Sequence, residues 1–131
     1  MKVLVVDDSR AMRAYVRGVL KDAGPWTVVE ASSGFEALRL LPREAFDLVI
    51  TDINMPDING LELVRFIRRS ERQGRVPLLI VSTLSSERDR ARVLELGADA
   101  FLAKPFEPED LRGAVAGLVP SVSAKDARGD E

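Results

Sequence analysis

Hydrophobic residues follow two alternating patterns along this chain. The first is a short, almost entirely apolar run, which occurs at residues 3–6, 26–29, 46–50, 78–81 and 100–103. The second is a longer stretch in which apolar residues recur every three or four positions, as at Met12, Val16, Val19 and Leu20. Continuous apolar runs are typical of strands covered on both faces, and the longer spacing is typical of amphipathic helices. The pattern predicts five strands alternating with five helices.

Residues that start and end helices stand at the expected junctions. Segments 33–36 and 86–89 each have a serine followed three residues later by an acid, as in a capping box. Gly24 and Gly97 stand where helices are expected to end, and Pro108 suits the first turn of the last helix. Together with the alternating apolar pattern, these helix starts and ends predict an α/β fold, a doubly wound five-stranded parallel sheet with right-handed crossovers.

The alternation extends to about Leu118, which predicts one folded domain over residues 1–118. Residues 119–131 contain Pro, Ser, Ala, Gly and charged residues with few apolar ones. Such a composition buries too little apolar surface to fold alone, so we expect a flexible tail or linker.

The composition excludes several classes of function. The chain has neither cysteine nor histidine, which rules out disulfides, zinc–histidine sites and Ser-His-Asp hydrolysis. Its 19 basic and 21 acidic residues leave a net charge of -2, which argues against direct nucleic-acid binding by bulk charge. No apolar run approaches the ~18 residues of a membrane span. Asp7 and Asp8 come too early for a signal peptide, so we expect a cytoplasmic protein.

Polar residues follow the predicted strands where each one ends. Asp7 and Asp8 follow the first strand, Asp52 the third, Ser82 the fourth and Lys104 the fifth. The carboxyl ends of parallel strands lie at one edge of a sheet, where ligands bind. These side chains are therefore expected to lie close together although they are far apart in the sequence.

Grouped carboxylates repel one another, and a divalent cation relieves that repulsion. An all-oxygen donor set without His or Cys favours Mg²⁺. Lys104 adds a positive charge suited to phosphate oxygens, and Ser82 can donate a hydrogen bond to the same group. One carboxylate can act as the nucleophile and form an acyl phosphate, so the set predicts phosphoryl transfer.

Four segments, 3–9, 47–56, 60–63 and 97–106, carry a family resemblance in both order and spacing. With them the chain resembles the receiver domain of two-component response regulators, and most of all the CheY-like single-domain type. The resemblance covers Lys2 to about Leu118. It implies a flavodoxin-like (βα)5 fold with strand order 2-1-3-4-5.

The resemblance also implies roles for individual residues. Asp52 would accept a phosphoryl group from the phosphohistidine of a sensor histidine kinase or a phosphotransfer protein. Asp7 and Asp8 would hold Mg²⁺ together with Asp52 and the backbone carbonyl of Asn54. Lys104 would contact the phosphoryl group. Any self-dephosphorylation would be slow, so the protein is expected to be a signalling module and not an enzyme.

A conformational switch is implied as well, with Ser82 as its hydroxyl and Phe101 as its aromatic residue. The phosphoryl group would draw Ser82 inward by a charge-assisted hydrogen bond, vacating space for the ring. The peptide bond between Lys104 and Pro105 is expected to be cis. Leu84 stands where a polar residue can orient water, so we expect slower self-dephosphorylation than with Glu there.

The family also suggests partner surfaces. The face built from the fourth helix, the fifth strand and the fifth helix would contact a downstream protein, and the first helix would face the kinase. A monomer or a weak phosphorylation-dependent dimer is expected. Four arginines at helical spacing are interpreted as a solvated face of the third helix, namely Arg65, Arg68, Arg69 and Arg72.

Three alternatives to a single-domain receiver are considered. The chain could be a receiver fragment of a larger multidomain regulator or hybrid kinase. A remote alternative is a Mg²⁺-dependent aspartyl-phosphate phosphatase of the haloacid-dehalogenase type, but that family needs Asp-x-Asp and a cap domain, and here Asp7 and Asp8 are adjacent. Dinucleotide binding is weaker still, because no glycine-rich loop follows the first strand.

Overall fold

A computed structural model describes residues 1–83 and 87–120 of the chain. The predictions for Leu84, for the helix cap at Ser86 and for nearly all of the 119–131 tail lie outside these residues.

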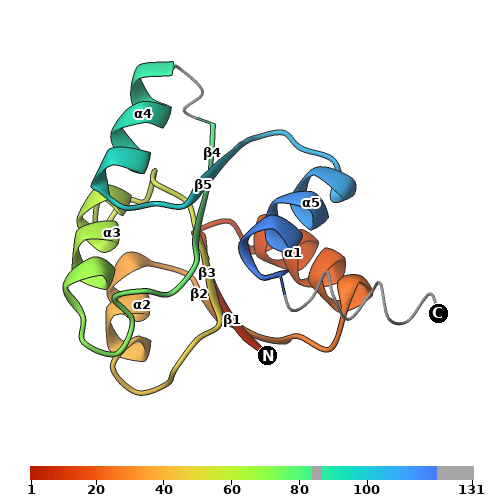
Figure 1. Ribbon diagram of the computed structural model, residues 1–131, viewed down its shortest axis with the longest axis horizontal. Helices are drawn as coiled ribbons and strands as arrows, with labels where there is room; N and C mark the ends of the chain where they lie inside the picture. Colours follow the sequence, from red (N-terminus) through yellow and green to blue (C-terminus); the bar gives the residue numbers. More distant parts are fainter. Residues whose placement is uncertain (84–86, 121–131) are drawn as a thin grey trace.

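The five strands form one parallel sheet in the order β2-β1-β3-β4-β5 (Figure 1). Their bounds are β1 (Lys2–Val6), β2 (Thr27–Ala31), β3 (Leu48–Thr51), β4 (Leu78–Ser82) and β5 (Ala100–Ala103). The predicted doubly wound, flavodoxin-like α/β fold is therefore confirmed, together with its strand order. β2 runs two residues further than its apolar run, because Glu30 and Ala31 continue the pairing with β1.

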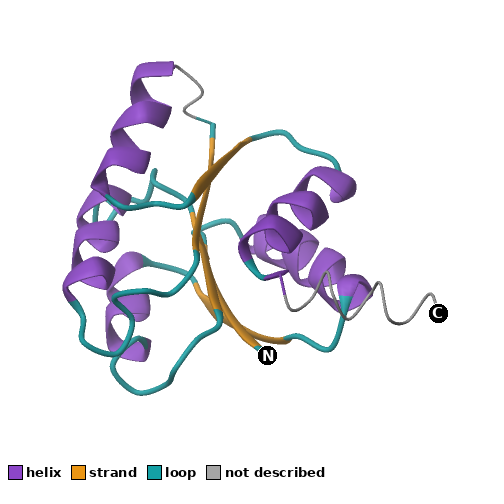
Figure 2. Cartoon of the chain, viewed as in Figure 1, coloured by secondary structure: helices purple, strands orange, loops and turns teal. Residues whose placement is uncertain are grey.

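In the described part of the chain, five helices cover the two faces of the sheet. They are α1 (Arg10–Ala23), α2 (Gly34–Leu40), α3 (Gly60–Arg69), α4 (Glu87–Leu96) and α5 (Pro108–Leu118). Helices α1 and α5 lie on one side and α2, α3 and α4 on the other (Figures 1 and 2). Each side buries its own apolar core, as at Val16 and Val115 on one side and Leu63 and Ile67 on the other. Burial on both faces is why the central strands β3 and β4 are almost entirely apolar.

Capping side chains fix where the helices begin. The hydroxyl of Ser33 accepts a hydrogen bond from the backbone N–H of Glu36, as the capping-box pattern predicts. Ser9 caps α1 in the same way, accepting from the N–H of Met12. Because Ser9 follows Asp7 and Asp8 directly, the start of α1 helps to hold those carboxylates at the sheet edge.

The interpretation of the arginines as one solvated face is wrong for two of the four. Helix α3 ends at Arg69, so Arg72 lies in the turn beyond it. Arg68 is mostly buried and donates hydrogen bonds to the carbonyl oxygens of Gly97, Gly74 and Val76. Helical spacing alone could not predict the burial of Arg68, because its partners Gly74, Val76 and Gly97 reach it only through the tertiary fold.

Within residues 1–83 and 87–120, no helix is long and apolar enough to cross a bilayer.

Candidate functional site: an acidic cluster at the carboxyl edge of the sheet

Strand pairing brings the predicted site residues to one edge. Asp7 follows β1 and Asp52 follows β3, and the register pairs Val6 with Thr51, directly before them. The N–H of Asp52 donates to the carbonyl oxygen of Val6 at 3.0 Å, so the hydrogen bonding between β1 and β3 continues up to Asp52. Two residues 45 positions apart in the chain therefore become neighbours because their strands are neighbours.

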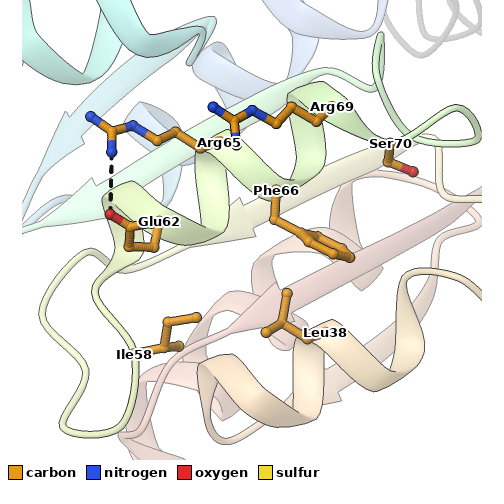
Figure 3. Close-up of a pocket in the computed structure, with 7 residues that line it drawn as sticks. All are labelled: Leu38, Ile58, Glu62, Arg65, Phe66, Arg69 and Ser70. Carbon is orange, nitrogen blue, oxygen red and sulfur yellow. Dashed lines mark hydrogen bonds and ion pairs between the residues drawn. The ribbon is translucent and has the colours of Figure 1, made fainter.

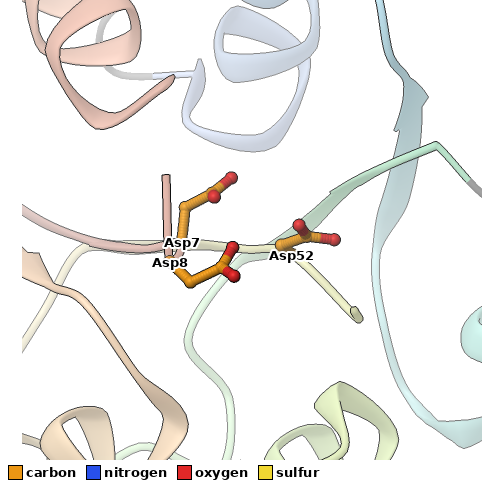
Figure 4. A group of neighbouring side chains, drawn as sticks. All are labelled: Asp7, Asp8 and Asp52. Atoms are coloured by element: carbon orange, nitrogen blue, oxygen red, sulfur yellow. The ribbon is translucent and has the colours of Figure 1, made fainter. Parts of the chain in front are cut away.

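Three carboxylates meet at this edge. Asp7, Asp8 and Asp52 each place a carboxylate oxygen within 4.8 Å of the others (Figure 4). Asp7 and Asp52 are buried, whereas Asp8 is exposed. Burying two like charges is unfavourable unless positive charge compensates them.

Lys104 supplies part of that charge. Its Nζ donates to Oδ2 of Asp7 at 2.9 Å and to Oδ2 of Asp52 at 3.1 Å. Burial of the ammonium acts to lower its pKa, but the hydrogen bond and charge of Asp7 and Asp52 outweigh it, and the pKa of Lys104 is raised. The peptide bond between Lys104 and Pro105 is cis, as expected.

The charges at this edge suit a hard divalent cation. Three carboxylates and one ammonium give the cluster a formal charge of −2. All the available donors are oxygens, one of the carboxylates is open to solvent, and the chain has no His or Cys. Mg²⁺ prefers such ligands and keeps several of its waters, so the residues present fit this ion.

Backbone groups orient the two buried carboxylates. The N–H of Ser9 donates to Oδ1 of Asp7 at 2.9 Å, and the N–H of Asn54 donates to Oδ1 of Asp52 at 3.0 Å. Each buried aspartate is therefore held through one oxygen by the loop that follows it and through the other by Lys104. The side chains are pre-positioned without requiring a ligand.

Ser82 is the last residue of β4, at the same edge of the sheet, and Phe101 lies on the neighbouring strand β5. Ser82 is fully buried and pairs with Ala103, and the N–H of Lys104 donates to its carbonyl oxygen at 2.9 Å. The ring of Phe101 is half-buried, with the guanidinium carbon of Arg90 5.2 Å from its centroid. That distance is within the range of a cation–π interaction.

The chain is similar to proteins of one known family. The profile described as "Response regulator receiver domain" matches residues 3–116. The chain belongs to the response regulator receiver family. It is 36% identical over 128 residues to a protein called "Chemotaxis protein CheY homolog" from Campylobacter jejuni, covering 97% of this chain and 98% of that protein. It is 37% identical over 113 residues to chemotaxis protein CheY1 of Helicobacter pylori, covering 86% and 91%.

Solved receiver structures share the fold. The chemotaxis response regulator CheY4 of Vibrio cholerae superposes with a TM-score of 0.84 at 37% identity, covering 89% of this chain and 97% of that one. The receiver domain of Francisella response regulator 1452 gives a TM-score of 0.83 at 29% identity, covering 92% and 97%. The chain is thus a CheY-like receiver, a class of signalling proteins and not of classical enzymes.

One residue of this receiver's site was missed by the sequence reasoning. The sequence pattern gave Arg13 no place in the site, but its Nη1 donates to the carbonyl oxygen of Asp7 at 2.6 Å. Its Nε donates to Glu30 at 3.0 Å, so it links the end of β1 to β2. Arg13 and Asp7 are six residues apart, on either side of the start of α1, and this spacing matches no helical or strand periodicity that the sequence pattern could reveal.

Proposed function

We propose that Asp52 accepts a phosphoryl group from the phosphohistidine of a sensor histidine kinase or phosphotransfer protein. The observation that carries the proposal is the buried Asp52 carboxylate, held beside Asp7 and Asp8 with Lys104 bridging it to Asp7. This geometry combines a nucleophile, excess negative charge for a cation and a fixed ammonium, which are the requirements of phosphoryl transfer.

The transfer is a displacement at phosphorus. A carboxylate oxygen of Asp52 forms the new P–O bond as the P–N bond to the donor imidazole breaks, and the leaving nitrogen keeps the electron pair. Asp7, Asp8, Asp52 and the backbone carbonyl of Asn54 would hold Mg²⁺, which supplies charge neutralisation at the phosphoryl oxygens. Because its pKa is raised, Lys104 stays protonated at neutral pH and offers its charge to the same oxygens.

The output of the switch follows from Ser82 and Phe101. A phosphoryl group on Asp52 attracts the Ser82 hydroxyl, and the half-buried ring of Phe101 then repacks on β5. The surface formed by α4, β5 and α5 changes with it and controls a downstream protein. In this proposal residues 1–118 are the receiver and 119–131 are a tail, and the protein is a monomer or a weak phosphorylation-dependent dimer.

Acetyl phosphate with Mg²⁺ tests the acceptor directly. Intact-mass measurement of the wild type should show one added phosphoryl group, which hydroxylamine removes because an acyl phosphate is labile to it. Asp52→Asn should show none. Asp22→Asn, an exposed aspartate at the end of α1, is the matched control and should be modified like the wild type. Undiminished modification of Asp52→Asn would refute the proposal.

A further inference from the structure

A second surface lies away from the acidic cluster, in the groove between α2 and α3. Its volume is about 340 Å³, which is at the small end of binding pockets. Figure 3 shows Phe66 of α3 pointing toward Leu38 of α2, with Ile58 at one end of the groove. The remaining lining residues are Glu62, Arg65, Arg69 and Ser70.

The side chain of Phe66 is exposed to solvent in this groove. Phe66 is 40% exposed, whereas its helix neighbours Leu63 and Ile67 are fully buried in the core. Phe66 and the half-buried Leu38 and Ile58 form an apolar patch, and aromatic residues are enriched in protein interfaces. The ring of Phe66 is therefore available as an anchor for another molecule.

The charges at the rim indicate the kind of partner. Arg65 has one ion pair, with Glu62 at 3.3 Å. Within the described ranges 1–83 and 87–120, Arg69 has no ion-pair partner, and neither does the exposed Arg39 that follows Leu38 on α2. An acidic partner would pair these arginines, and arginine beside an aromatic residue is a frequent composition of interface hot spots.

The groove is already formed in the free protein. The carboxylate of Asp57 accepts hydrogen bonds from the N–H groups of Gly34 and Phe35 at 3.2 and 3.0 Å, which ties the loop after β3 to the start of α2. A Cβ on Gly34 would overlap Cγ2 of Ile58, so only glycine permits this approach. A preformed groove lowers the ordering cost of binding.

We propose that the α2–α3 groove is a docking site for an acidic amphipathic helix of a partner protein. An apolar side chain of that helix would pack on Phe66 and Leu38, and its flanking carboxylates would pair with Arg65 and Arg69. A second copy of this chain fits less well, because a two-fold contact through this groove places two arginine-bearing surfaces against each other. The site is separate from the α4–β5–α5 surface and does not depend on phosphorylation of Asp52.

The probe is a synthetic helix of about 16 residues, roughly 24 Å long, with leucines on one face and glutamates on the flanks. A second peptide has lysine in place of every glutamate. Titration of labelled wild-type protein should shift the NMR signals of Leu38, Phe66 and Arg69 with the acidic peptide and not with the basic one. Equal binding of both peptides, or of neither, would overturn the proposal.

Variants locate the contact. Phe66→Ala and Arg69→Glu should each weaken the acidic peptide roughly tenfold or more. The matched controls are Phe35→Ala, an exposed phenylalanine outside the groove, and Arg112→Glu, an exposed arginine on α5. Both controls should bind like the wild type, and circular dichroism checks that every variant is folded. Unaffected binding in Phe66→Ala, or sedimentation of the protein as a Phe66-dependent dimer, would contradict the assignment.

Discussion

Arg68 and Gly97 hold the end of α3 against the turn that follows α4. Nε of Arg68 donates to the carbonyl oxygen of Gly97 at 2.7 Å, and Nη2 reaches Asp99 at 2.9 Å. Gly97 has a φ of 122°, in the region that disfavours side chains. A Cβ there would lie 2.8 Å from Cγ of Arg68. The glycine thus serves the close approach of the arginine as well as the backbone turn.

Gly97→Ala should lower the free energy of unfolding by roughly 1–3 kcal/mol, because the alanine would carry both backbone strain and the clash with Arg68. Urea denaturation measures the change. Gly18→Ala is the matched control, since Gly18 lies in α1 with nothing within 4 Å of its Cβ position. That replacement should stabilise the protein by roughly 0.5–1 kcal/mol. A Gly97→Ala protein as stable as the wild type would contradict this explanation.

The sheet edge could be predicted from the sequence because topology alone determines it. When five apolar strands alternate with helices in a parallel sheet, the residues that follow each strand lie at the same edge of the sheet. This rule predicted that Asp7, Asp52 and Lys104 lie together, and the structure places them so. Contacts that depend on where helices end or how they lie on the sheet could not be predicted. The contacts of Arg68 with Gly97 and of Arg90 with Phe101 are of this second kind, because the local hydrophobic periodicity does not predict either pair.

Lys104→Ala should separate cation binding from phosphoryl binding. Removing the ammonium changes the formal charge of the cluster from −2 to −3, so Mg²⁺ should bind at least as tightly as in the wild type. Retention of the phosphoryl mimic BeF₃⁻ should fall roughly tenfold or more, because its charge-assisted donor is lost. Calorimetric titrations with Mg²⁺ alone and with BeF₃⁻ present measure the two effects.

Lys21→Ala is the control for that experiment, as an exposed lysine in the last turn of α1. It should change neither titration. If Lys104→Ala lost Mg²⁺ and BeF₃⁻ affinity in equal measure, Lys104 would be maintaining the shape of the site and not binding the phosphoryl group.

Glu30 should make the stability depend on pH below neutrality. Burial acts to raise its pKa, but hydrogen bonds from Arg17 and Arg13 outweigh burial and hold the pKa below the ordinary 4.5. The folded state therefore binds this proton less readily than the unfolded state. The stabilisation is present above about pH 4.5 and is lost as the pH falls through the lower folded value.

Glu30→Gln tests that prediction through urea denaturation at a series of pH values. The variant should be less stable than the wild type at pH 7, and the difference should shrink as the pH falls below 4.5. Glu95→Gln, an exposed glutamate on α4, is the control and should follow the wild-type profile. A stability difference that stayed constant with pH would show that Glu30 acts through packing and not through its charge.

The guanidinium carbon of Arg90 lies 5.2 Å from the ring centroid of Phe101. A cation–π contact at an exposed site is worth about 0.5–1 kcal/mol, and it stabilises the ring where it is now. If Phe101 must move when the site is occupied, that energy opposes the active state. Arg90→Leu should therefore increase BeF₃⁻ affinity by roughly 2–5-fold, since binding and ring movement are linked.

Arg90→Lys should keep part of the effect, because an ammonium also interacts with the face of a ring. Arg92→Leu removes another exposed arginine from the same helix, and because Arg90 is the residue that lies over the ring, this variant should leave the affinity unchanged. Phe101→Leu should abolish the difference between Arg90 and Leu at position 90, which a double-mutant cycle measures. Undiminished coupling in the Phe101→Leu background would mean that Arg90 acts through another group, and the aromatic switch would have to be sought elsewhere.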